Sequence, residues 1–219
     1  MSGLFFTLNL PMIRILLLLL MLSGIAVQSQ GKPSIAEIER NVQDSTSAFF
    51  YERLLFRFVS LPSLLSTEEG RHLYYGQYKG RKRNPAEAER AFFELVSANK
   101  CVEAITAGEQ LLKTDAVNLE ILGRLLQCYS KADKGNPQAP HRLAQFRILL
   151  DAALNSATGP SDHKTYTVMN VVDGYILAAT LGTDLMQFRR RSRSVPEGML
   201  DNWKKGRKKI SFLVIYSKE

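Results

Sequence analysis

The sequence predicts a mostly α-helical protein of the α+β class, in which stacked antiparallel helices precede a small C-terminal antiparallel β element. Two observations predict this class. Apolar residues recur at helical spacing through the first two thirds of the chain, and the last third contains segments that are β-branched and alternating. The composition of the 219 residues, 45% hydrophobic and 23% charged, is that of an ordinary globular protein. We assign residues 1–29 to a signal peptide, residues 30–157 to a helical domain and residues 158–219 to a β-containing part of the same domain.

The N-terminal segment predicts export. Residues 15–27 form a run of thirteen uncharged, leucine-rich residues that follows Arg14 and precedes a polar stretch, as in a signal peptide. A bilayer-spanning helix needs about 20 apolar residues, so this run is too short to be one. We therefore expect cleavage near Ser29, a periplasmic or secreted protein, and no transmembrane span after cleavage. An uncleaved anchor is the alternative, and Met12 is an alternative start codon to Met1.

Three helices are expected between residues 34 and 80. Ser34 and Glu37 have the spacing of a capping box, which predicts a helix to about Val42. Asp44 or Ser45 is expected to cap the next helix. Its apolar residues run to Val59, and Pro62 follows it. A second capping box, residues 66–69, opens a helix through Tyr75, and residues 80–85 form a basic loop.

The most regular pattern in the chain follows Pro85. Short polar turns separate apolar-periodic segments, which predict helices over residues 85–98, 101–113, 117–132 and 139–156. The string from Asn99 to Asn118 resembles the second helix of a tetratricopeptide unit, with Ala104 at the close helix contact. A generic helical bundle is the alternative interpretation.

Beyond residue 158 the pattern favours strands. Residues 164–172 are β-branched and alternating, and residues 175–181 read as a short helix. The run 209–216 is the strongest strand signal in the chain, and a turn at 205–207 leads into it from residues 199–203. We expect two or three antiparallel strands packed against the helices.

The two cysteines form a candidate pair. Cys101 and Cys128 lie equally far from a turn predicted at residues 113–115, so they face each other in an antiparallel helical hairpin. An oxidising compartment permits a disulfide there. Two buried free thiols fit the same apolar helix faces. A metal site is not expected from two cysteines this far apart and three histidines.

The positive charge is confined to the C-terminal segment. The chain has a formal net charge of +8, yet residues 187–219 hold ten basic residues against three acidic ones and the stretch before them is balanced. Because export removes most nucleic acid from the environment, we expect binding of lipid phosphate, lipopolysaccharide or acidic glycan. A solvated loop and hairpin tip, whose charges prevent edge pairing, is the alternative. The candidate anion-binding residues are Arg189, Arg190, Arg191, Arg193, Lys204, Lys205, Arg207, Lys208 and Lys209.

Candidates for a small-molecule site are few. His72, Tyr74, Tyr75 and Tyr78 form a candidate groove in which aromatic faces stack on a sugar, although aromatic residues at helical spacing usually belong to a core. The run Ser161–His163 is adjacent in sequence, which is not the geometry of a Ser-His-Asp triad. No phosphate loop, metal cluster or nucleophile elbow is present. We therefore assign no catalytic residue, no cofactor and no metal.

Four segments carry a resemblance to a known family. They are the run FFYERLLFRF at residues 49–58, the phrase Leu73–Gly76, the segment entering Asp173–Tyr175, and the strand Ile210–Phe212. Together they resemble a family of uncharacterised exported proteins from Bacteroidota that carries a domain-of-unknown-function label. The resemblance spans most of the mature chain. It implies a fold and a compartment and no activity.

Three functions follow as hypotheses. The first is a non-catalytic exported interaction or scaffold protein of the cell envelope, whose stacked helices bind a protein or peptide partner. The second is a binder of anionic envelope components through residues 189–209. The third is a hydrolase with an unrecognised site. We do not expect an enzyme, and we do not expect a nucleic-acid partner.

Overall fold

The computed structural model describes residues 34–80 and 83–215, except for the side chains of residues 78–80. The expectations of a signal peptide, a cleavage site near Ser29 and a start at Met12 concern residues outside these ranges. Arg81 and Lys82 of the basic loop also lie outside them. Among the described helices, none has the length and the apolar character needed to cross a bilayer.

Two of the first three helices, α2 (Ile35–Gln43) and α4 (Thr67–Gly80), begin where local capping predicts. Helix α2 starts at Ser34, whose Oγ accepts a hydrogen bond of 3.2 Å from the Glu37 N–H. Helix α4 has the full capping box, because the Glu69 N–H donates to Ser66 Oγ at 3.2 Å and the Ser66 N–H donates to Glu69 Oε2 at 2.8 Å. The short 3₁₀ helix η1 (Pro62–Leu64) leads into α4.

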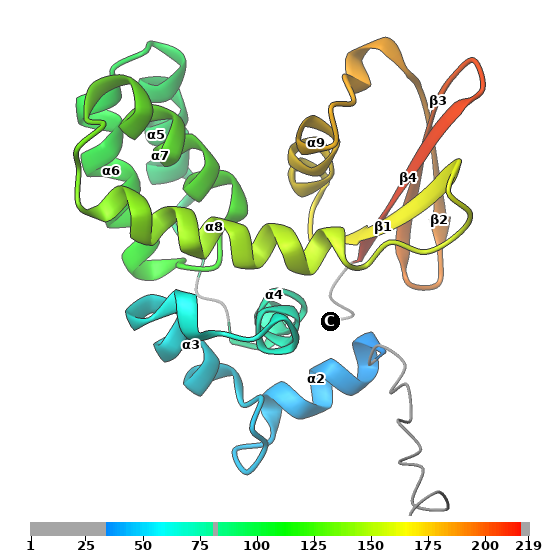
Figure 1. Cartoon of the computed structure of the whole chain (residues 1–219), viewed down its shortest axis with the longest axis horizontal. Helices are drawn as coiled ribbons and strands as arrows, with labels where there is room; N and C mark the ends of the chain where they lie inside the picture. The colour runs from blue at the N-terminus through cyan, green and yellow to red at the C-terminus, as the bar shows by residue number, and fades with distance from the viewer. Residues whose placement is uncertain (1–33, 81–82, 216–219) are drawn as a thin grey trace, which may run out of the picture. The chain divides into compact units, whose positions relative to one another are not determined.

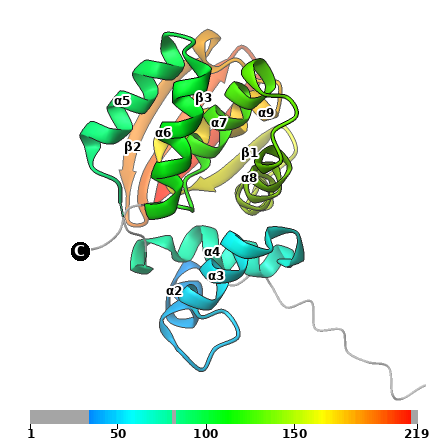
Figure 2. The ribbon, with the colours of Figure 1, turned by 90° about the vertical axis from the view of Figure 1, so that its left-hand side faces the viewer.

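Helix α3 (Tyr51–Ser60) starts later than the sequence predicted. Asp44 does not cap it, because the Asp44 carboxylate accepts hydrogen bonds from the Thr46 N–H at 2.9 Å and the Thr46 hydroxyl at 2.7 Å. This local turn uses the side-chain oxygen that a helix cap requires. Helices α2 and α3 both pack on α4, and the three lie together (Figure 2).

The next four helices confirm the regular pattern that follows Pro85. They pack in chain order, with α5 on α6, α6 on α7 and α7 on α8. Gly108 in the second of them allows this close approach, since a Cβ there would lie 2.7 Å from both Leu125 Cδ2 and Phe92 Cε2. The four are α5 (Ala86–Ser97), α6 (Cys101–Thr114), α7 (Leu119–Ala132) and α8 (Gln138–Leu154).

The sheet is larger than predicted and is mixed. It has four strands in the order β1-β4-β3-β2, where β1 is parallel to β4 and the other two pairs are antiparallel. The prediction of two or three antiparallel strands was therefore wrong in number and in the direction of β1. The chain crosses over through α9 after β1, which places β1 parallel to the last strand. The strands are β1 (His163–Val168), β2 (Arg189–Val195), β3 (Gly198–Lys205) and β4 (Lys208–Ile215).

Strand β2 was not predicted. Its sequence, RRRSRSV, has no apolar residue before Val195, so it carries no alternation of apolar and polar side chains. Pairing with β3 along its whole length forms the strand, which lies at the edge of the sheet. Exposed arginines suit an edge because they oppose pairing with another chain.

Helix α9 (Val171–Thr180) covers one face of the sheet. It starts before the predicted residue 175, because the Asn170 side chain caps it by accepting a hydrogen bond of 2.8 Å from the Asp173 N–H. Gly174 allows close contact with Phe212, and the Tyr175 ring meets Trp203 edge-on at 5.7 Å. In Figure 1, α9 lies between the sheet and the helices α5 to α7, and none of the described elements covers the opposite side of the sheet, which we call the open face.

Candidate anion-binding site

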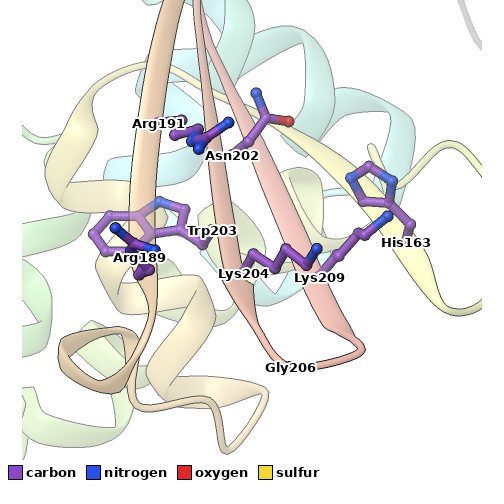
Figure 3. A pocket seen from close by; sticks show the side chains of 8 residues that line it. All are labelled: His163, Arg189, Arg191, Asn202, Trp203, Lys204, Gly206 and Lys209. Atoms are coloured by element: carbon purple, nitrogen blue, oxygen red, sulfur yellow. The ribbon is translucent and has the colours of Figure 1, made fainter.

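The pairing register aligns cationic side chains across the sheet. In β1, His163 is the partner of Lys209 in β4; Lys209 is the partner of Lys204 in β3, and Lys204 is the partner of Arg189 in β2. Partners in register point to the same side of a sheet. These four residues, which we call the basic row, run across all four strands next to the β3–β4 turn (Figure 3).

The basic row lies on the open face because side chains alternate along each strand. Ile210 and Phe212 are buried, and Phe212 packs against α9. Lys209 directly precedes Ile210 in β4, so its side chain points to the opposite face. By the same alternation, Trp203 faces α9 and Lys204 does not. Lys204, Lys209 and Arg189 are exposed.

A hydrogen-bonded row lies next to the basic row. It consists of Thr165, Ser211, Asn202 and Arg191 in register. The Ser211 hydroxyl donates to Asn202 Oδ1 at 2.8 Å, and His163 Nε2 lies 2.9 Å from Ser211 Oγ. Since the single Ser211 proton goes to Asn202, His163 Nε2 must donate to Ser211. The serine therefore fixes the imidazole in place.

The basic row, together with Asn202 and Arg191, lines a hollow of about 600 Å³ (Figure 3). Arg189 and Arg191 reach it from the edge strand, and Asn202 also accepts the hydrogen bond from Ser211. Within the described residues, no carboxylate pairs with Arg189, Arg191, Lys204 or Lys209. The lining residues are His163, Arg189, Arg191, Asn202, Trp203, Lys204, Gly206 and Lys209.

The structure separates the nine predicted anion-binding residues into three groups. Arg189, Arg191, Arg193, Lys204 and Lys209 share the open face by register. Arg190 faces the other way, where its guanidinium lies 5.6 Å from the Trp203 ring and donates to buried Asp201 at 2.6 Å. The remaining three, Lys205, Arg207 and Lys208, are exposed at the hairpin turn.

The predicted groove is not formed by His72, Tyr74 and Tyr75, because these three side chains are buried in the core. The His72 ring stacks on Phe49 at 3.8 Å between centroids, donates from Nδ1 to the Glu68 carbonyl at 2.9 Å, and accepts at Nε2 from the Asn41 amide at 3.1 Å. Its hydrogen bonds are thus satisfied within the protein. The side chain of Tyr78 lies outside the described part of the chain.

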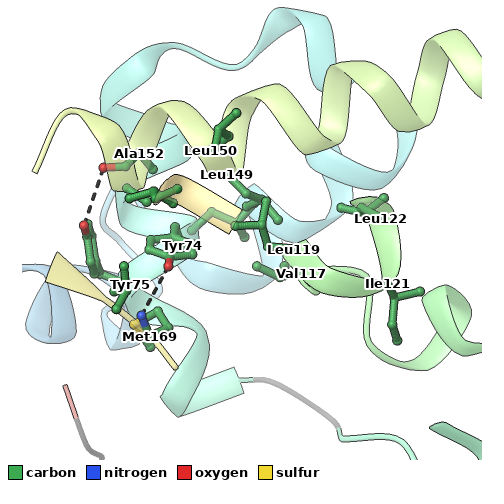
Figure 4. Close-up of a cluster of buried hydrophobic side chains, with 14 of the residues drawn as sticks. Tyr74, Tyr75, Val117, Leu119, Ile121, Leu122, Leu149, Leu150, Ala152 and Met169 are labelled. Carbon is green, nitrogen blue, oxygen red and sulfur yellow. Dashed lines mark hydrogen bonds between the residues drawn. The ribbon is translucent and has the colours of Figure 1, made fainter. Parts of the chain in front are cut away.

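Tyr74 and Tyr75 join α4 to the β-containing part of the chain. The Tyr74 hydroxyl accepts a hydrogen bond of 3.2 Å from the Met169 N–H (Figure 4) and donates to Asp173 Oδ2 at 2.6 Å. The Tyr75 hydroxyl donates to the Thr167 carbonyl at 2.9 Å. Burial raises the pKa of Tyr74 well above its usual value and raises the pKa of Tyr75 to about 12. Both tyrosines are structural.

Cys101 and Cys128 are buried free thiols in this structure. They lie side by side across the α6–α7 hairpin, as their spacing predicted. Burial, followed by a hydrogen bond with Cys101, raises the pKa of the Cys128 thiol to about 11. Of the two alternatives that the sequence left open, the structure has the thiols.

Sequence reasoning missed the partner of His163. The neighbouring Ser161 and Asp162 suggested a triad that was rejected on geometry, whereas the actual partner, Ser211, lies 48 residues later. Only the parallel pairing of β1 with β4 brings them together. No local motif predicts such a contact.

These features define a mostly helical α+β protein with a basic, uncovered sheet face. The chain belongs to the family described as "Domain of unknown function (DUF4919)", whose family model matches residues 36–195. No curated protein and no solved structure matches the chain. The matched range contains His163 and Arg189 of the basic row and ends before Lys204 and Lys209.

Proposed function

We propose that the protein is a non-catalytic binder of anionic ligands, which contact the open face of the sheet. The observation that carries the proposal is the basic row, His163, Lys209, Lys204 and Arg189, set in register across four strands. With neighbouring strands about 4.8 Å apart, the row spans about 14 Å. That length suits a ligand with several anionic groups.

The residue types favour phosphate, sulfate or carboxylate. Arg189, Arg191 and Arg193 repeat every second residue along β2, so their side chains recur at about 6.6 Å. A guanidinium grips an oxyanion with two parallel hydrogen bonds, and a lysine adds a mobile point charge.

The hydrogen bonds at the site support binding without catalysis. A serine nucleophile needs a neighbouring base that accepts its proton. At this site Ser211 donates to Asn202, an amide, and His163 is oriented to donate to Ser211. The row therefore holds its side chains in position.

Isothermal titration calorimetry with sodium tripolyphosphate, carried out at low and at high salt, tests the proposal. The triple variant Arg189→Gln, Lys204→Gln, Lys209→Gln is expected to bind at least about tenfold more weakly than the unchanged chain. The control removes three exposed cations outside the sheet, two on helices α6 and α8 and one in the turn before α8: Lys113→Gln, Arg147→Gln and Lys134→Gln. Equal loss of affinity in both variants contradicts a specific site, because net charge alone then accounts for binding.

A second candidate function, binding of a protein partner, rests on the α3–η1 surface. Phe56, Val59, Leu61 and Leu64 are between 46% and 71% exposed over nine consecutive residues. Exposed apolar clusters commonly mark interaction surfaces. A pull-down from an envelope extract that recovers the same partner with the unchanged chain and loses it with Phe56→Ser and Leu64→Ser supports this function. Identical recovery by both chains contradicts it.

The finer assignments made from the sequence are also proposals. The apolar run 15–27 supports a cleaved signal peptide and export, and the resemblance supports an origin in Bacteroidota. The pairwise packing of α5 to α8 supports a tetratricopeptide-like interpretation of residues 99–118. Mass spectrometry of the N-terminus of the protein recovered from its native cell envelope tests export, and a mature start near Gln30 is the expected result.

A further inference from the structure

We propose that the protein docks on the surface of an anionic phospholipid membrane through the end of the sheet where β3 and β4 meet. This docking end consists of residues 181–188 and the hairpin turn 205–208. The inference rests on the proposed anion binding and names the source of the anion as a lipid headgroup. Binding of a soluble anion would not explain why the docking end also exposes apolar side chains.

The docking end presents apolar side chains to solvent. Met186 is 86% exposed and Leu181 is 42% exposed, whereas Leu185 between them is buried. The short 3₁₀ helix η2 (Leu185–Gln187) sets this orientation. Asp184 caps it by accepting hydrogen bonds from the Met186 N–H at 3.1 Å and from the Gln187 side chain at 2.8 Å. Met186 is therefore held outward by local structure.

Basic side chains surround these apolar residues. The Lys205 ammonium donates to Gln187 Oε1, which ties the hairpin turn to η2. Lys205 and Lys208 line a hollow of about 530 Å³, together with Gly182, Thr183, Asp184, Gln187 and Phe188. Leu181 lines a second hollow, of about 460 Å³, with Arg207, Lys208 and Lys209. The apolar and cationic groups thus share one end of the sheet.

The docking end and the two hollows beside it carry a net positive charge. Asp184 caps η2, and Asp162 lines the second hollow together with Lys164. Five cations stand against these two acids: Lys164, Lys205, Arg207, Lys208 and Lys209. The basic row lies directly beside this end, because Lys204 and Lys209 flank the turn.

A membrane matches both properties at once. An anionic leaflet attracts lysine and arginine near its surface, and apolar side chains gain by entering the boundary of the acyl chains. A soluble polyphosphate or glycan offers the charge and no apolar layer. A membrane therefore accounts for the exposed apolar side chains of Leu181 and Met186 at the end of the sheet that carries these lysines.

A reporter at position 186 tests the inference in the full chain. Met186→Cys is labelled with an environment-sensitive dye, and Cys101 and Cys128 do not compete because both are buried. The unchanged chain serves as the labelling control. We expect a blue shift in dye emission with vesicles of phosphatidylglycerol and phosphatidylcholine, and none with phosphatidylcholine alone. Because the dye reports on the surroundings of position 186, this response is distinguished from vesicle binding through the apolar run 15–27. The absence of a shift with anionic vesicles overturns the inference.

A second pair of variants separates the inference from the proposed function. Leu181→Ser with Met186→Ser is expected to weaken binding to phosphatidylglycerol vesicles about tenfold or more and to leave tripolyphosphate affinity unchanged. Val102→Ser, at an apolar residue exposed on α6, is the matched control and is expected to change neither. If tripolyphosphate binds the unchanged chain, but the double variant and the Val102→Ser control bind vesicles equally well, the docking inference fails and the proposed anion binding stands. If tripolyphosphate does not bind the unchanged chain, the proposed function fails as well.

Discussion

His163 and Ser211 are joined by a 2.9 Å contact between Nε2 and Oγ across two parallel strands that lie 48 residues apart in the chain. The contact continues to Asn202 at 2.8 Å. It fixes the imidazole at one end of the basic row. The geometry of the proposed anion site therefore depends on a small, buried serine.

We predict that Ser211→Ala destabilises the protein by about 1–2 kcal/mol and weakens tripolyphosphate binding. The variant removes the acceptor for His163 and the donor for Asn202, at a position where the side chain is 1% exposed. Urea unfolding and calorimetry measure the two effects. Ser194→Ala, on the exposed edge strand, is the control. Unchanged stability and affinity in Ser211→Ala contradict the positioning role.

A second prediction concerns Glu109, which connects three helices. Its carboxylate accepts hydrogen bonds from Arg142 Nε at 2.9 Å and from the Tyr129 hydroxyl at 2.7 Å. Burial would raise the pKa of Glu109, but these hydrogen bonds outweigh burial and hold the pKa below its usual value. Allowing for solvent screening of the partly exposed pair, Glu109→Gln is expected to lower the free energy of unfolding by about 1–2 kcal/mol at neutral pH.

The pH dependence of the Glu109 contribution follows from the lowered pKa. A depressed folded-state pKa gives stability that is present above the unfolded-state value, near 4.5, and is lost as the pH falls through the folded-state value. Urea unfolding of both chains between neutral and acidic pH measures this. The difference between them is expected to shrink only below the unfolded-state value. A constant difference down to strongly acidic pH would contradict the assignment.

We predict that Tyr74→Phe destabilises the protein by about 2–3 kcal/mol. The hydroxyl donates to the buried carboxylate of Asp173, and a lost hydrogen bond to a buried charged group is costly. Tyr75→Phe, which loses a hydrogen bond to a neutral carbonyl, is expected to cost less. Chemical denaturation compares the two. A larger effect in Tyr75→Phe would show that Tyr74 does not hold α4 to α9.

The last prediction concerns the thiols. Because Cys101 and Cys128 are buried and burial raises the pKa of Cys128 to about 11, both are expected to react slowly with a thiol reagent in the native protein. Unfolding is expected to release two reactive thiols. Protein unfolded without reductant that shows no thiol would instead establish a disulfide between them.

Much of the fold follows from local sequence. Ser34 and Ser66 cap helices where their spacing with a glutamate predicts, because capping involves residues three apart. The helices after Pro85 follow from apolar spacing for the same reason. Strand β2 escaped prediction because RRRSRSV has no apolar alternation, and Asp44 was misassigned because Thr46 competes for its carboxylate.

The candidate site shows the limit of local reasoning. Local sequence indicates that the positive charge lies in residues 187–219, and that His72, Tyr74 and Tyr75 belong to one helix. Tertiary packing buries those three side chains and turns Arg190 toward Asp201. It also brings His163 to the same face as Lys209, Lys204 and Arg189. The physical reason is that helix caps and periodicity depend on near neighbours, whereas strand register and the face of a sheet depend on pairing between distant segments and on what covers them.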